Sequence, residues 1–214
     1  MPPVAVLFDF DGTLLDTESV ALLTWVEEYR AHGLSLDQDA WIAAVGAETD
    51  HYATLARHVG PAFDLAACHG RRRGRENALV AAVEPADGIE AALTALAAAG
   101  TRLAVVSSSP ATWVLPHLDR LGWMGRFEAV VTREDAARAK PHPDLYVMAL
   151  ARLGVRPHDV VAVEDSANGV RAAVAAGLRC VAMPNPVTAH HDLSLAISRC
   201  APAGLLTALG LAQG

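Results

Sequence analysis

Carboxylate side chains stand at the end of two short apolar runs in this chain of 214 residues. Asp9 and Asp11 follow the run VAVLF, and Glu164 and Asp165 follow the run VVAV. Carboxylates that gather in a partly dry crevice repel one another, and their pKa values rise unless a cation lies among them. A hard divalent ion that prefers oxygen ligands, Mg²⁺ above all, would resolve this conflict.

Hydroxyl groups and a lysine complete the set of candidate reactive groups. Three consecutive serines, Ser107 to Ser109, follow the apolar run RLAVV, and Lys140 lies in the segment after the next apolar run. A lysine can offset the charge of a phosphate, and hydroxyls can hold its oxygens. Carboxylates, Mg²⁺, a lysine and hydroxyls together suit the chemistry of a phosphate ester.

These residues can meet only if the runs before them are neighbouring strands of one sheet. Strands are expected at 4–10, 102–107, 128–131, 159–164 and 179–183, and helices at 87–100, 111–121, 143–153 and 167–176. The first of these helices is expected to open with a capping box from Asp87 to Glu90. This alternation predicts an α/β fold, a Rossmann-like parallel sheet with helices on both faces, in which ligands bind beyond the carboxyl ends of the strands.

The segment from Thr17 to Val83 has no convincing strand. Its apolar residues recur at helical spacing near 20–26, 39–45, 51–59 and 74–83. We therefore expect an inserted all-helical domain at 16–83 and a catalytic core made of residues 1–15 and 84–214.

Four motifs, in order along residues 4–183, resemble those of the haloacid dehalogenase superfamily, whose members mostly cleave phosphate esters through an aspartyl-phosphate. The segment DFDGTL from Asp9 to Leu14 resembles the opening motif, and Ser107 falls where the superfamily has its phosphate-holding Ser or Thr. Lys140 in AKPHPDLY matches the lysine that precedes a proline, and VEDSANG matches the terminal acidic pair.

The resemblance implies that Asp9 is the nucleophile that attacks phosphorus, while Lys140 and Mg²⁺ offset the charge of the phosphate. Asp11 would protonate the leaving oxygen and then deprotonate the water that attacks the intermediate. A spacing of two keeps both aspartates on the same side of an extended segment, and Gly12 permits the turn that brings Asp11 over the phosphate.

The resemblance also implies a magnesium site and a phosphate site. Mg²⁺ would be bound by the Asp9 carboxylate, the backbone carbonyl of Asp11 and Asp165, with Glu164 acting nearby or through water. Ser107 and the amides after it would hold the phosphate oxygens.

The helical insert resembles the cap of the subgroup that includes phosphoglycolate phosphatases, sugar-phosphate phosphatases and β-phosphoglucomutase. Two hinge strands, near 14–17 and 83–87, would let this cap close over the crevice and expel water. Specificity would come mainly from the cap, and the arginine run at 71–75 is expected to be a solvated helix face from which one arginine could reach the substrate. The candidate substrate contacts are Thr17, Glu18, Thr49, Ser108 and Asn168.

A phosphatase is the favoured interpretation, and a mutase like β-phosphoglucomutase is the alternative. Such a mutase restrains its acid–base aspartate with a histidine and binds a second phosphate with a cap arginine. Ungapped comparison from DFDGT places Ala21 and Thr49 at these positions. Ala21 cannot restrain the aspartate as a histidine does, and Thr49 cannot bind a second phosphate as an arginine does. A non-catalytic phosphosugar sensor is a more remote alternative.

Composition excludes several other classes of protein. The net charge is −7, and the basic cluster at 69–75 has no interleaved aromatic residues to stack bases, so no nucleic-acid partner is expected. No apolar stretch reaches the ~20 residues that a membrane helix needs, and the N-terminus lacks the basic region of a signal peptide. We expect a cytoplasmic monomer or weak dimer that acts on a small phosphorylated metabolite.

Overall fold

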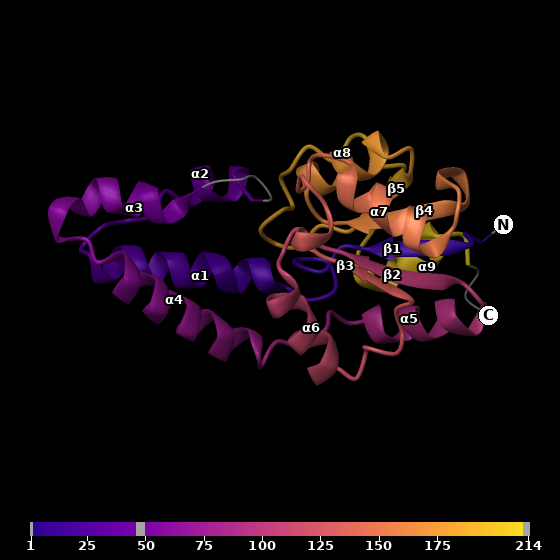
Figure 1. Cartoon of the computed structure of the whole chain (residues 1–214), viewed down its shortest axis with the longest axis horizontal. Coiled ribbons are helices and arrows are strands. Elements are labelled where there is room, and N and C mark those ends of the chain that lie inside the picture. Colours follow the sequence, from indigo (N-terminus) through magenta and orange to yellow (C-terminus); the bar gives the residue numbers. More distant parts are fainter. Residues whose placement is uncertain (1, 46–49, 212–214) are drawn as a thin grey trace.

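A parallel sheet forms the centre of the computed structural model, which describes residues 2–45 and 50–211. Its strands lie in the order β3-β2-β1-β4-β5-β6 (Figure 1). Their bounds are β1 Ala5–Phe8, β2 Arg102–Val106, β3 Ala129–Val131, β4 Val160–Glu164, β5 Arg179–Ala182 and β6 Ser198–Arg199. Phe8 at the end of β1 is in register with Val105 of β2 and Val163 of β4, so the carboxyl ends of these three strands meet at one edge.

Helices cover both faces of the sheet, which confirms the predicted α/β fold. On one face, Val6 and Phe8 of β1 pack with α5 (Ile89–Ala98), α6 (Ala111–Arg120) and α9 (Leu205–Ala208). On the other face, Ala5 and Leu7 pack with α7 (Asp144–Leu153) and α8 (Ala167–Ala175). This alternation follows from the two-residue period of a strand, and it requires that every residue of β1 be apolar.

The helices between β1 and α5 form a separate layered unit beside the carboxyl edge of the sheet (Figure 1). They are α1 Thr17–Ala31, α2 Gln38–Ala43, α3 His51–Val59 and α4 Leu65–Val80. An aspartate precedes each helix and accepts a hydrogen bond from a backbone amide of the first turn, which satisfies a donor that the helix cannot. These capping residues are Asp16, Asp37, Asp50 and Asp64.

Aromatic residues form the interior of this helical unit. Trp25, Tyr29 and Trp41 are buried there, and Val187 from the segment after β5 packs against them. A hydrogen bond of 2.9 Å between His191 Nε2 and the Ile42 carbonyl oxygen adds a second contact between the two units. None of the described helices is long and apolar enough to cross a bilayer.

Several predicted details are wrong. The sequence analysis missed β6 and α9, because a strand of two residues and a helix of four carry too little pattern. The capping box at Asp87 to Glu90 is absent, since Gly88 is the N-cap of α5 and makes no side-chain bond, while Glu90 instead accepts a hydrogen bond of 2.8 Å from the Trp123 indole.

The segments that join the two units are not strands. Residues 82–87 have no strand, and near residue 15 there is only an isolated bridge between Asp11 and Leu15. The helix predicted near 74–83 begins much earlier, at Leu65 in α4. Short 3₁₀ turns lie at Gly60–Ala62, Arg133–Asp135, Pro157–Asp159 and Pro202–Gly204.

Candidate active site

Asp9 follows β1 at the carboxyl edge of the sheet, where its amide donates a hydrogen bond to the Val163 carbonyl oxygen. This bond extends the ladder with β4 by one residue, so the carboxylate is fixed beyond the strand ends. The side chain is nearly buried and lies 2.5 Å from Lys140 Nζ. A buried carboxylate held next to a buried ammonium group has the placement of an oriented nucleophile.

Lys140 connects Asp9 to a second carboxylate. Its Nζ is 2.7 Å from Glu164 Oε1, and it also donates to the Val106 carbonyl oxygen at 2.7 Å. Tyr146 donates to the same Glu164 oxygen at 2.5 Å. Glu164 is fully buried and is not among the residues that line the cavity described below.

The clustered charges shift the pKa values of Asp9, Lys140 and Asp165. Burial and the negative charge of Glu164 raise the pKa of Asp9 to about 8, although Lys140 acts in the opposite direction. Burial by itself would lower the pKa of Lys140, but the charges of Asp9 and Glu164 raise it above the usual lysine value. Burial, Asp9 and Glu164 raise the pKa of Asp165 well above its usual value. The site therefore holds more negative charge than its own lysine can neutralise.

Asp11 accepts hydrogen bonds from four side chains. Trp113 Nε1 donates to its Oδ1 at 2.7 Å, and the Thr17 hydroxyl donates to the same oxygen at 2.9 Å. The hydroxyls of Ser109 and Ser107 donate to its Oδ2 at 2.6 and 3.3 Å. Because these donors come from both units, the orientation of Asp11 depends on the junction between them.

Gly12 forms the turn directly after Asp11, with a φ of 76° that favours glycine. A Cβ at this position would collide with the carboxylate of Asp165 and the amide of Asn185. Asn185 Nδ2 donates to the Gly12 carbonyl oxygen at 3.1 Å and to Asp165 Oδ2 at 2.8 Å, and Thr188 donates to that same oxygen at 3.2 Å. Asn185 thus joins the Gly12 turn to the carboxylate of Asp165 and fixes their relative positions.

The donor set fits a magnesium ion. Oxygen atoms of Asp9, Glu164 and Asp165 all lie within 4.8 Å of one another. Glu164 Oε2 is buried and has no hydrogen-bond partner among the described residues. Oxygen-only donors with an unbalanced negative charge are the ligands that Mg²⁺ prefers, and a cation among them would lower their pKa values.

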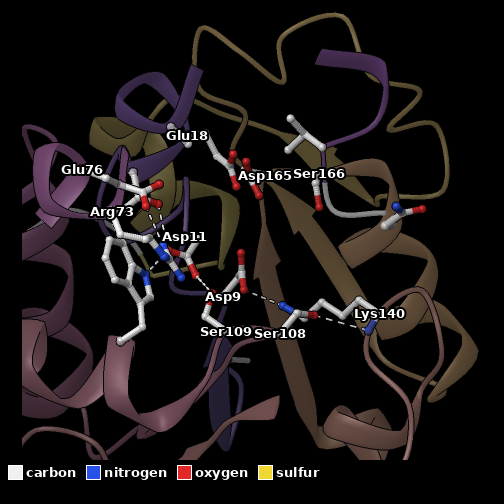
Figure 2. A pocket seen from close by; sticks show the side chains of 15 residues that line it. Asp9, Asp11, Glu18, Arg73, Glu76, Ser108, Ser109, Lys140, Asp165 and Ser166 are labelled. Carbon is white, nitrogen blue, oxygen red and sulfur yellow. Dashed lines mark hydrogen bonds and ion pairs between the residues drawn. The ribbon is translucent and has the colours of Figure 1, made fainter. Parts of the chain in front are cut away.

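A cavity of about 230 Å³ opens over these groups at the junction of the two units (Figure 2). Of the predicted residues, Asp9, Asp11, Lys140 and Asp165 line it, and so do the predicted substrate contacts Thr17, Glu18, Ser108 and Asn168. Thr49 lies outside the described residues. Ser107 is fully buried behind the cavity, where its hydroxyl also accepts a hydrogen bond from the Ser109 amide at 2.9 Å.

Charged residues of the helical unit form the opposite wall. Arg73 Nη1 lies 2.5 Å from Glu76 Oε2, and the Arg73 guanidinium stacks over the Trp113 ring at 5.3 Å (Figure 2). Arg72 is buried instead, bound to Glu76 and Tyr52 at 3.1 and 2.8 Å. The prediction of a solvated arginine face is therefore wrong for Arg72.

The sequence analysis missed several residues of the site. Asn185 could have been found, because it follows the end of β5 as the other site residues follow their strands. Trp113, Tyr146 and Glu76 are carried by helices, and the sequence pattern held no signal for them.

Comparisons with known proteins identify the family of this chain. The family model for haloacid dehalogenase-like hydrolases matches residues 4–177. A phosphoglycolate phosphatase from Xylella fastidiosa is 34% identical and the match covers 89% of this chain and 84% of the relative. A fructose-1-phosphate phosphatase from Escherichia coli, YqaB, is 32% identical over 82% of this chain and 94% of the relative.

A solved structure also resembles this chain over nearly its whole length. CbbY from Rhodobacter sphaeroides in complex with phosphate superposes with a TM-score of 0.79 at 31% identity, covering 98% of this chain and 100% of that chain. The chain belongs to the haloacid dehalogenase-like hydrolase family. It is a phosphatase of that family, a class that hydrolyses phosphoric monoesters.

Proposed function

We propose that this enzyme hydrolyses a small phosphorylated metabolite, a sugar phosphate or a similar compound, through a phosphoryl group carried on Asp9. The observation that carries the proposal is the buried Asp9 carboxylate, 2.5 Å from Lys140 Nζ at the floor of a cavity that Asp11 also lines. The named activities of the relatives support the substrate class.

The steps follow from the positions of the two aspartates. An Asp9 oxygen attacks phosphorus, the bond between phosphorus and the ester oxygen breaks, and protonated Asp11 gives its proton to the departing alcohol. Asp11 then takes a proton from a water molecule that attacks the acyl phosphate, which releases phosphate and regenerates Asp9. Lys140 neutralises charge throughout, because it is already buried and ionised.

Magnesium is the proposed cofactor. Asp9, Asp165 and the backbone carbonyl of Asp11 would hold it, with Glu164 nearby. When bound, it would neutralise charge on the transferring phosphoryl group. Ser107 and the neighbouring amides remain the proposed phosphate contacts. We also propose a cytoplasmic monomer or weak dimer, with a cap at 16–83 and a core at 1–15 and 84–214.

A burst experiment tests the two aspartates separately. The p-nitrophenolate leaving group departs without a proton, so Asp11→Asn should still be phosphorylated but should lose its general base, which contributes about 10² to 10⁴ in rate. We expect Asp11→Asn to release close to one p-nitrophenolate per enzyme and to gain the mass of one phosphoryl group. Asp9→Asn, with an unchanged circular dichroism spectrum, should give neither. Steady turnover by Asp9→Asn would contradict the covalent role.

The mutase alternative is disfavoured by the wall of the cap. A mutase must bind a second phosphate there, yet Arg73 is the cap arginine that lines the cavity among the described residues, and it is ion-paired with Glu76. We expect free phosphate from sugar monophosphates without a bisphosphate activator. Conversion of β-glucose 1-phosphate to glucose 6-phosphate after bisphosphate priming, with little free phosphate, would establish the mutase instead.

A further inference from the structure

The cavity wall carries more acidic than basic side chains. Its carboxylates are Asp9, Asp11, Glu18, Glu76 and Asp165, and its cations are Arg73 and Lys140. The formal excess among these described residues is three negative charges, the five carboxylates less the two cations. In the proposed reaction, the charges of Mg²⁺ and of the substrate's phosphate dianion sum to zero. The excess negative charge of the wall therefore acts on the leaving group of the substrate.

Among the arginines of α4 that do not line the cavity, Arg72 offsets one of these charges because it bonds Glu76, and an excess of two remains. Arg71 binds Glu28 at 2.5 Å, Arg75 binds Glu27 at 3.2 Å, and Arg72 is buried against Glu76. Each guanidinium group is therefore already paired with a carboxylate of its own unit. Of the described cations that line the cavity, Lys140 contacts Asp9 and Arg73 contacts Glu76, so a substrate carboxylate would have to share a cation with one of these groups, and an incompletely paired charge in a partly dry cavity is costly.

Glu18 is the carboxylate of the helical cap that can bind the leaving group of the substrate. It lies in the first turn of α1, and Figure 2 shows its side chain pointing toward Asp165. No described side chain donates a hydrogen bond to it, in contrast to Asp11 and Glu76. Glu18 lines the same cavity as Asp9, Asp11 and Asp165, so a further anion beside these carboxylates would be opposed.

Neighbouring groups suit hydroxyls better than an ammonium group. Arg73 and Glu76 stand side by side on the same wall and offer donors and acceptors together, as do Thr17, Ser109 and Asn168. A hydroxyl both donates and accepts, so it can satisfy each of them. An ammonium group can only donate, and the Arg73 guanidinium on the same wall would repel it.

We infer that the leaving group of the natural substrate is an uncharged polyol, whose hydroxyls bind Glu18, and that this wall rejects leaving groups that carry a carboxylate. This inference rests on the proposed function and deepens it, since it separates sugar or polyol phosphates from phosphoglycolate and phosphoglycerate. The phosphoglycolate phosphatase relative would then differ from this chain in substrate.

Pairs of substrates that differ in a single group isolate the effect of charge on the leaving group. Glycerol 3-phosphate and 3-phosphoglycerate differ by a hydroxymethyl group in place of a carboxylate, and 2-hydroxyethyl phosphate and 2-phosphoglycolate differ in the same way. Ethanolamine phosphate adds a positive charge to the smaller scaffold. We expect kcat/KM to be at least about ten-fold higher for the uncharged member of each pair, and 2-hydroxyethyl phosphate to exceed ethanolamine phosphate.

The variant Glu18→Gln tests the residue. The amide keeps the size of the side chain and removes its charge, so the preference for glycerol 3-phosphate over 3-phosphoglycerate should fall about ten-fold. Glu27→Gln is the matched control, because Glu27 lies on the same helix but pairs with Arg75 away from the cavity. The control should keep the wild-type preference. Thermal unfolding of both variants checks that they are folded.

The outcomes separate this inference from the proposed function. Equal or better turnover of the carboxylate substrates or of ethanolamine phosphate would overturn the inference, and so would a preference that Glu18→Gln leaves unchanged. Hydrolysis of p-nitrophenyl phosphate without any turnover of the polyol phosphates would also overturn it. Without turnover of p-nitrophenyl phosphate itself, the proposed function fails and the inference fails with it.

Discussion

Asp11 shows how much of the chemistry of a residue depends on its hydrogen bonds. The Trp113 and Ser109 donors at 2.7 and 2.6 Å fix the carboxylate in one orientation, and the Arg73 guanidinium stacked over the Trp113 ring extends the contact to the cap. A general acid must be positioned within hydrogen-bond reach of the leaving oxygen. We therefore propose that Trp113 positions Asp11 for this role.

We expect Trp113→Phe to lower kcat by about ten-fold with little change in KM, because it removes one of the four donors that orient the Asp11 carboxyl group and keeps the ring beneath Arg73. Steady-state kinetics with a substrate that needs acid catalysis measures the effect. Trp41→Phe is the control, since the Trp41 indole N–H is buried without a partner among the described residues and its loss breaks no bond. Equal losses in both variants would refute the positioning role.

At the scale of elements, α8 places Glu164 by leaving room for it. Ser166 caps this helix by accepting a hydrogen bond of 3.1 Å from the Gly169 amide. A Cβ on Gly169 would overlap the carboxyl group of Glu164, which bonds Lys140 and Tyr146. Glycine at this position is thus required by the close approach of a side chain.

Gly169→Ala should lower both stability and activity. The added methyl group must displace Glu164 from Lys140, and overpacking of this kind costs about 1–3 kcal/mol, more than the gain in helix propensity. Gly70→Ala in α4 meets no atom within 4 Å and should instead stabilise the protein by about 0.5–1 kcal/mol. Urea unfolding should show opposite signs for the two variants, and kcat should fall for Gly169→Ala alone. A stable, fully active Gly169→Ala protein would contradict this account.

At the scale of the whole molecule, carboxylates from both units converge at their junction. Asp9 and Asp165 come from the sheet, and Glu18 and Glu76 come from the cap. Figure 2 shows Glu18 and Asp165 beside each other across this junction. A divalent cation should therefore stabilise the fold by relieving repulsion between the two units.

This stabilisation should depend on pH. The pKa of Asp9 is raised from its ordinary value of 3.8 to about 8 in the folded protein, so the metal-free protein loses stability progressively as the pH rises between these two values, and the loss is complete above pH 8. Mg²⁺ requires ionised ligands and must displace these protons at lower pH. We expect the rise in Tm on adding Mg²⁺ to be small at pH 6 and to reach about 5–10 °C near pH 8.5 at ~100 times Kd.

Differential scanning fluorimetry with and without Mg²⁺, at constant ionic strength, provides the measurement. Asp165→Ala should lose most of the shift at both pH values, because it removes a ligand. The same Tm rise at pH 6 and pH 8.5 would contradict proton competition at the site.

Much of the fold could be predicted from local patterns in the sequence. The residues of β1 are apolar without interruption because the strand is covered on both faces, and that pattern is visible in VAVLF. The rule that ligands bind beyond strand ends then located Asp9, Asp11, Lys140 and Asp165, all of which line the cavity. β6 was missed because it pairs through only two residues.

The sequence by itself determined the sheet, the helical insert and the reactive groups, because periodicity, strand ends and short motifs are local properties of a chain. Only the tertiary structure decided which groups meet across that chain. Trp113 reaches Asp11 and Asn185 reaches Gly12 across more than a hundred residues, and no local pattern encodes such pairs. The charge balance of the cavity wall was partly decided in the same way, because Arg71 and Arg75 meet Glu28 and Glu27 only when α1 and α4 pack together, whereas Arg73 meets Glu76 within α4 itself.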